Sequence, residues 1–100
     1  MMATHIVAWN YKPEVTEEER ARLNKERDEA FAKLIGIVPG MTRVRFIYDL
    51  LPGSTHSFMT ISEHEDNDAV QAYAAHPMHN ELADKYIRPF VQDRCVINFE

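Results

Sequence analysis

The chain has 100 residues, a net charge of −5 at pH 7, and 45% hydrophobic against 27% charged residues. That length fits a single domain, residues 1–100, and that composition is typical of a globular protein and excludes a disordered one. The apolar runs are too short to cross a membrane, and no basic run offers the positive face that nucleic acids require. We therefore expect small molecules or a second copy of the chain as partners, and neither nucleic acid nor a membrane.

The single cysteine, Cys95, has no partner for an internal disulfide and lies in an apolar strand pattern. We expect it to be reduced and buried. The first residues also lack a basic stretch followed by a long apolar segment, so we expect no secretion signal. Both features favour a cytoplasmic protein.

The first strand is predicted over residues 4–11, which are rich in β-branched and aromatic side chains. Thr16 and Glu19 then have the spacing of a helix capping box. They predict a helix that runs to about Gly36, with Arg27 set among the apolar residues of its stripe. We expect the Arg27 side chain to reach solvent from that stripe; the alternative is that it binds an anionic group of a ligand at the cleft.

Two further strands are predicted over residues 42–50 and 55–63, after a turn at 38–40 and with a loop at 51–54 between them. The second of these strands places alternate side chains on a common face, namely His56, Phe58, Thr60 and Ser62. His64 follows it among acidic residues, and we expect it to lie exposed in a loop without a role.

A short helix is predicted to begin at Asp66-Asn67-Asp68 and to reach Ala75. Pro77 ends it, because proline disfavours helical geometry in the preceding residue and suits the first turn of a second helix, over 77–89. Residues 93–99 predict the last strand. The order β-α-β-β-α-β corresponds to a ferredoxin-like α+β arrangement, in which a four-stranded antiparallel sheet carries its helices on one face.

The other face of this sheet would present Trp9, Phe58 and similar side chains to water. An apolar patch of that size is rarely left bare, so we expect a partner to cover it. A two-fold homodimer is the commonest way to do so.

Tyr73 and His79 lie on either side of the predicted helix break. His79 falls in the first turn of the second helix, where the positive end of the helix dipole favours a neutral imidazole that can accept a proton. A phenol and a neutral imidazole in this arrangement predict an acid–base pair. The alternative, equally open on these residues, is a corner between two helices whose polar side chains only cap backbone groups. We assign the cap of the second helix to His76.

Several short motifs in a fixed order extend over the whole chain, namely His5-Ile6-Val7, Lys12-Pro13, Ile37-Val38-Pro39-Gly40, Thr55-His56 and Tyr73…His76-Pro77-Met78-His79…Tyr86…Arg88-Pro89. With these motifs the chain resembles the stress-responsive dimeric α/β-barrel (Dabb) family. The resemblance implies that two sheets pack face to face into a dimeric barrel and that each subunit keeps a cleft between its sheet and helices.

The resemblance also implies one activity. A plant polyketide cyclase of the family closes a linear chain by intramolecular aldol condensation, and its reactive histidine and tyrosine match His79 and Tyr73. Two further pocket histidines of that enzyme match His5 and His56. Arg27 and Asp28 stand near where the plant enzyme has phenylalanines that line an alkyl pocket, so a long apolar tail is not the expected ligand.

The candidate site therefore has His79 and Tyr73 as catalytic residues, with a substrate-binding set of His5, His56, Val7, Trp9 and Phe58. Each strand histidine alone is more typical of a neutral, hydrogen-bonded core residue. Together with Tyr73 and His79 they favour one shared cavity, which suits removal of a proton next to a carbonyl group. No carboxylate is spaced with the histidines as in a metal motif, so we expect neither a metal nor another cofactor; a cation bound by the histidines is the minority alternative.

Three functions remain open from the sequence. The first is a cofactor-free acid–base enzyme, an aldol-type cyclase or isomerase that acts on a small carbonyl compound. The second is a stress-associated dimer that binds a ligand without turnover. The third is a cofactor-independent monooxygenase of the antibiotic-biosynthesis type, whose markers are not evident here. Resemblance of fold alone does not transfer a reaction.

Overall fold

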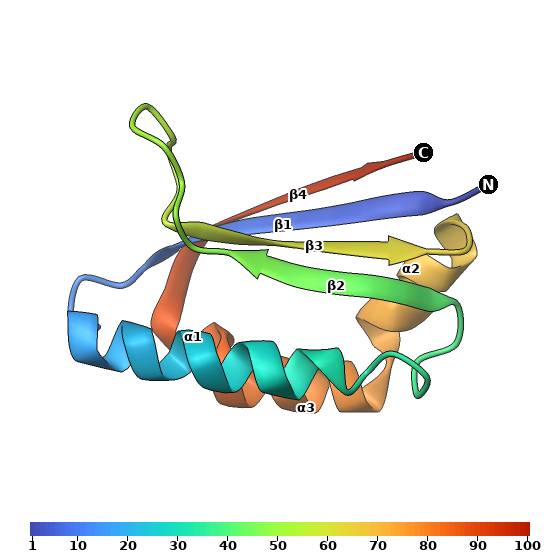
Figure 1. The fold of residues 1–100 in the computed structure, drawn as a ribbon, viewed down its shortest axis with the longest axis horizontal. Helices are drawn as coiled ribbons and strands as arrows, with labels where there is room; N and C mark the ends of the chain where they lie inside the picture. Colours follow the sequence, from blue (N-terminus) through green and yellow to red (C-terminus); the bar gives the residue numbers. More distant parts are fainter.

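Four antiparallel strands form one sheet in the order β2-β3-β1-β4, with the helices on one face (Figure 1). The computed structural model describes residues 1–100. In chain order the elements are β1 (Ala3–Tyr11), α1 (Glu17–Ala32), β2 (Met41–Ile47), β3 (Phe58–His64), α2 (Asn67–Ala75), α3 (Pro77–Tyr86), the 3₁₀ turn η1 (Arg88–Phe90) and β4 (Val91–Phe99). The predicted ferredoxin-like α+β arrangement is confirmed.

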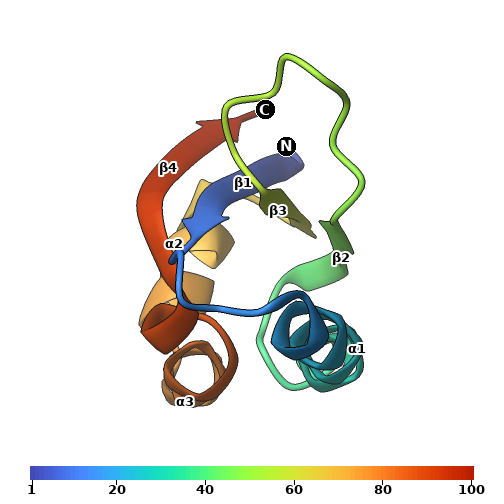
Figure 2. The same cartoon turned by 90° about the vertical axis from the view of Figure 1, so that its left-hand side faces the viewer.

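Several predicted boundaries were wrong. Strand β2 ends at Ile47 rather than residue 50, and β4 begins at Val91 rather than residue 93. Helix α1 ends at Ala32 rather than Gly36, and Gly36 lies beyond it with a φ of 91°, a left-handed conformation that a continuing helix does not allow. Strand β3 begins at Phe58 rather than residue 55, so a loop projects from the sheet between β2 and β3 (Figure 2). Helix α3 ends at Tyr86, before the separate turn that contains Pro89.

The predicted helix caps are confirmed. Thr16 accepts a hydrogen bond from the Glu19 N–H, and the Glu19 side chain accepts one from the Thr16 N–H, which completes the capping box. The His76 side chain accepts a hydrogen bond from the Met78 N–H at the start of α3. Four orphan N–H groups begin every helix, and these side chains satisfy some of them.

The core lies between the sheet and the helices. Odd-numbered β1 side chains and even-numbered β3 side chains point toward the helices, so Trp9 and Phe58 are buried there and stack with ring centroids 5.1 Å apart. The expectation that these two residues lie on the outer face was therefore wrong. The outer face instead carries Ile97 and Phe99, which remain 53% and 51% exposed.

Arg27 is fully buried, at 0% exposed, and the expectation of a solvent-exposed side chain was wrong. Its Nε and Nη2 atoms donate to the Tyr86 carbonyl at 3.3 and 2.9 Å, and Nη1 donates to the Tyr11 hydroxyl at 3.1 Å. The guanidinium carbon lies 4.5 Å from the centroid of the Phe58 ring. Polar acceptors and an aromatic face thus replace the water that a cation normally requires.

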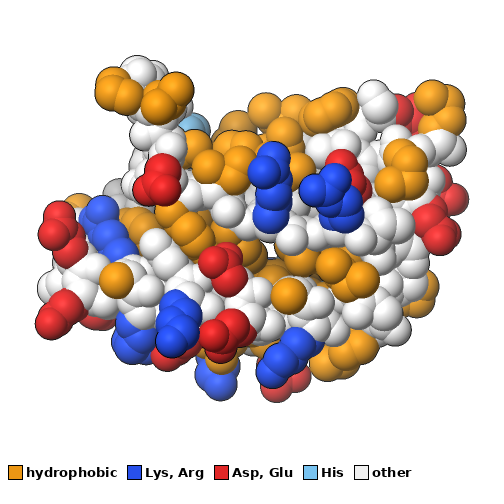
Figure 3. All heavy atoms as spheres, viewed as in Figure 1, with side chains coloured by type: hydrophobic (Ala, Val, Ile, Leu, Met, Phe, Trp, Pro, Cys, Tyr) orange, Lys and Arg blue, Asp and Glu red, His pale blue; other side chains and the backbone are white.

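Cys95 is exposed, which contradicts the expectation of a buried thiol. It pairs with Ala8 across the two strands and so points to the outer face of the sheet. Apolar side chains gather along the sheet and on the loop that projects between β2 and β3 (Figure 3). Leu51 of this loop is 78% exposed. No helix in the structure combines the length and the apolar character that spanning a membrane demands.

Candidate functional site

A cavity of about 290 Å³ lies between the sheet and the two C-terminal helices. Its walls are mainly apolar, with a few polar groups, as is typical of small-molecule sites. The residues that line it are His5, Val7, Trp9, Phe31, Thr60, Tyr73, Ala74, His79, Ala83, Ile87, Arg88, Val91, Gln92, Asp93 and Arg94.

Tyr73 and His79 lie against each other in this cavity. Tyr73 is in the last turn of α2, His79 is the third residue of α3, and their ring centroids are 4.2 Å apart. The chain can bring them together because His76, with φ −65° and ψ 131°, breaks the helix before Pro77. The helix break therefore creates the predicted pair.

The imidazole of His79 is neutral at pH 7. Burial lowers its pKa to about 4, and the positive charge of Arg88 acts in the same direction. Its Nδ1 atom is buried without a hydrogen-bond partner in the protein. The ring is thus in the form that can accept a proton.

The Tyr73 hydroxyl remains protonated. The side chain is 2% exposed, and burial raises its pKa above the ordinary value. A buried neutral phenol is a hydrogen-bond donor for a charge that develops next to it. It therefore has the character of an oxyanion stabiliser.

His64 is a member of this cluster that sequence reasoning missed. It is 0% exposed, its ring centroid lies 5.0 Å from that of Tyr73, and Nε2 forms a hydrogen bond of 2.8 Å with the Ser62 hydroxyl. Burial lowers its pKa to about 4. The alternation of Phe58, Thr60 and Ser62, extended by one further step, would have placed His64 on this face.

His5 completes the cluster from β1. Its ring centroid lies 6.0 Å from that of Tyr73, and its Nδ1 atom donates to the side-chain oxygen of Asn98 on β4. Burial lowers the pKa of His5, so this ring is also neutral at pH 7. Three imidazoles from β1, β3 and α3 thus surround one phenol.

Two residues of the predicted substrate-binding set do not line the cavity. His56 lies in the loop before β3, where its Nε2 atom donates to the Asp93 carbonyl at 3.1 Å. Phe58 is covered by Trp9 and Tyr11. The reason for His56 is the late start of β3, which leaves it outside the strand alternation. Val7 and Trp9 do line the cavity, together with His5.

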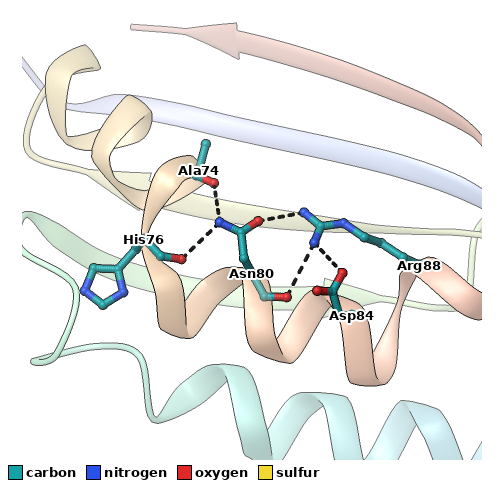
Figure 4. A network of polar contacts seen from close by, with 5 residues as sticks. All are labelled: Ala74, His76, Asn80, Asp84 and Arg88. Atoms are coloured by element: carbon teal, nitrogen blue, oxygen red, sulfur yellow. Dashed lines mark hydrogen bonds and ion pairs between the residues drawn. The ribbon is translucent and has the colours of Figure 1, made fainter.

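Asn80 fixes the geometry of the helix break (Figure 4). Its amide nitrogen donates to the carbonyls of Ala74 and His76, and its side-chain oxygen accepts from Arg88 Nη2 at 2.8 Å. Arg88 Nη1 also contacts Asp84 at 2.7 Å. The end of α2, the start of α3 and one cationic wall of the cavity are therefore held together.

No group of three or more His, Cys, Asp or Glu side chains is arranged to hold a metal ion. The histidines of the cluster instead lie ring against ring around Tyr73. The chemistry that these residues offer is proton transfer and hydrogen bonding.

Comparison with known families gives a match over residues 3–100 to the family described as Stress responsive A/B Barrel Domain. The resemblance seen in the sequence motifs is confirmed. Comparison with curated proteins finds no match.

Solved structures with the same fold include a dimeric ferredoxin-like protein of unknown function from Bacteroides fragilis, with 25% identity, a TM-score of 0.85, and coverage of 99% of this chain and 95% of that one. Hydroxynitrile lyase from Passiflora edulis has 18% identity and a TM-score of 0.74, with 98% and 91% coverage. A mutant of SnoaB, a cofactor-independent oxygenase from Streptomyces nogalater, has 17% identity and a TM-score of 0.67, with 99% and 91% coverage. The last two likenesses establish the fold alone.

Proposed function

This chain belongs to the stress-responsive A/B barrel domain family, and we propose that it is a cofactor-free acid–base enzyme that removes a proton next to the carbonyl group of a small compound. An aldol-type cyclase and an isomerase both require this step. The observation that carries the proposal is the contact between a neutral imidazole, His79, and a protonated phenol, Tyr73, inside a cavity.

In the proposed step, His79 accepts the proton while the C–H bond of the substrate breaks. The electron pair moves to the carbonyl oxygen, which gains negative charge, and the Tyr73 hydroxyl donates a hydrogen bond to it. The imidazolium then returns the proton, to another carbon in an isomerisation or to the oxygen of the second carbonyl in an aldol closure. No cofactor is needed to balance either reaction.

The low pKa of His79 sets a condition on this mechanism. A pKa of about 4 ensures that the ring is neutral at pH 7, but it also makes the ring a weaker base than an ordinary imidazole. General acid–base catalysis contributes about 10²–10⁴-fold, so the stabilisation of the enolate by Tyr73 must supply a large share of the rate. His5, with its second ring nitrogen free, is placed to orient the ligand.

We further propose that two copies pair through the outer face of the sheet. This face carries Ile97 and Phe99, both about half exposed, and the similar structure from Bacteroides fragilis is dimeric. The free thiol of Cys95 is compatible with a reducing cytoplasm, which is the proposed location.

The test is exchange of carbonyl-adjacent protons for deuterium, followed by NMR on a panel of small ketones and oxo acids. We expect exchange with the wild type, none above background with His79→Ala, and a strong reduction with Tyr73→Phe. Arg22→Gln is the matched control, since Arg22 lies on the exposed surface of α1, outside the cavity. A panel without any exchange, in which some compounds still raise the melting temperature, would instead favour the ligand-binding dimer.

A further inference from the structure

Strand β4 carries an irregularity at the cavity. The pairing with β1 shifts between Ala8 and Asn10, so that Asp93 and Arg94 together oppose the single residue Trp9. Asp93 has a φ of 57° and is the one residue besides glycine with a positive φ. Such a bulge redirects side chains and is frequent beside functional sites.

Two contacts hold Asp93 in this conformation. The side chain of Asn10 donates to Asp93 Oδ2 at 3.1 Å, and His56 Nε2 donates to the Asp93 carbonyl at 3.1 Å. The Asp93 carboxylate thus has a partner other than its neighbour Arg94. This also gives His56 a structural task, since it supports the bulge from outside the cavity.

Arg94 lines the cavity and has no acceptor in the chain. The three ion pairs of the protein involve other residues, and the guanidinium of Arg94 forms no hydrogen bond. Arg88, also on the cavity wall, is fixed by Asn80 and Asp84. Two arginines and one acidic residue therefore line the cavity, although the whole chain has a net charge of −5.

The positive charges of Arg88 and Arg94 act on the histidines of the cavity. Arg94 contributes to the lowered pKa of both His5 and His79, after the larger effect of burial, and Arg88 contributes for His79. A guanidinium group matches a carboxylate with two parallel hydrogen bonds, and Arg94 is exposed at the cavity, where a ligand can reach it. The apolar walls of Trp9 and Phe31 can hold the carbon skeleton between these arginines and the acid–base pair.

We propose that the substrate is an oxo acid, a small ketone that carries a carboxylate, and that Arg94 binds this carboxylate with Arg88 supporting the positive field. This inference rests on the proposed function, because it names the substrate class of the same cavity. In the reaction the carboxylate stays intact, and only the carbon next to the ketone exchanges its proton through His79.

The experiment uses benzoylpropionate and its uncharged analogue benzoylpropionamide, which share the same ketone and differ in the charged group. Binding is measured by NMR titration and proton exchange in deuterium oxide. We expect the wild type to bind the acid about tenfold more tightly than the amide, as for other charge-assisted hydrogen bonds. Arg94→Gln should remove this preference, and Arg94→Lys should restore part of it, because lysine keeps the charge without the planar fork.

The control is Arg22→Gln, since Arg22 lies on the exposed surface of α1 and should leave the preference unchanged. Equal affinity for acid and amide in the wild type, a full preference retained by Arg94→Gln, or no binding of either probe would overturn the inference. Equal exchange of both probes would leave the proposed acid–base step standing and refute only the oxo-acid assignment. If the wild type prefers the acid, Arg94→Gln loses this preference, and neither probe exchanges its protons, the oxo-acid assignment stands and the proposed acid–base step is refuted.

Discussion

The buried imidazole of His64 predicts a loss of stability in mild acid. Its pKa is about 4 in the folded protein, against an ordinary value of 6.5 that applies to the unfolded chain. The unfolded chain therefore takes up a proton at His64 first as the pH falls. The contribution of this histidine to the free energy of unfolding is complete at pH values above 6.5, the pKa in the unfolded chain. It is lost progressively as the pH falls from there toward 4.

The size of the effect follows from the shift. One pKa unit corresponds to about 1.4 kcal/mol, so at about pH 5 the loss from His64 alone is about 2 kcal/mol. The side chain is 0% exposed, so solvent screening does not reduce this value. The lowered pKa values of His5 and His79 add to the loss in the same direction.

Urea denaturation at a constant protein concentration, at about pH 7 and about pH 5, measures this loss. His64→Phe cannot take up the proton, so its difference in unfolding free energy between the two pH values should be smaller than that of the wild type by about 2 kcal/mol. At the higher pH this variant loses only the hydrogen bond to Ser62, about 1 kcal/mol. Arg22→Gln, on the exposed surface of α1, leaves the three buried rings in place and should behave as the wild type. An unchanged pH dependence in His64→Phe would refute the reasoning.

Three further predictions concern stability and assembly. Arg27→Ala should lower the free energy of unfolding by about 3 kcal/mol or more in urea, because it leaves a cavity and an unpaired carbonyl; a loss below about 1 kcal/mol would contradict the buried network. Gly40→Ala should lower the melting temperature more than Gly36→Ala. Both glycines have a positive φ, but only at Gly40 would an added Cβ collide, 2.6 Å from Ala69 Cβ. Equal melting temperatures of the two variants would contradict this clash. Ile97→Asp should convert the proposed dimer to monomers in sedimentation, and an unchanged mass would exclude this face as the interface.

Local signals in the sequence predicted most of the fold. The capping box at Thr16 and the helix break at Pro77 depend on neighbours within a few residues, so both could be found without the structure. The pair of Tyr73 and His79 followed from that break. These features also ordered the elements correctly along the chain.

Contacts between distant residues decided the features that were missed. Arg27 is buried because the Tyr86 carbonyl, 59 residues away in the sequence, accepts its hydrogen bonds. His56 lies outside the cluster and His64 belongs to it, because β3 begins and ends later than its alternating pattern suggested. The acidic neighbours of His64 pointed to a loop, although β3 extends to His64 and Glu63 alternates with it along the strand.

The interruption between α2 and α3 determines whether Tyr73 and His79 can touch. On an unbroken α-helix, side chains six positions apart are separated by about 9 Å along the axis and by roughly 240° of rotation. Tyr73 and His79 could not touch in that geometry, whatever their identity. Sequence changes that straighten this corner would therefore separate the two rings and abolish the proposed proton transfer, even if Tyr73 and His79 themselves were kept.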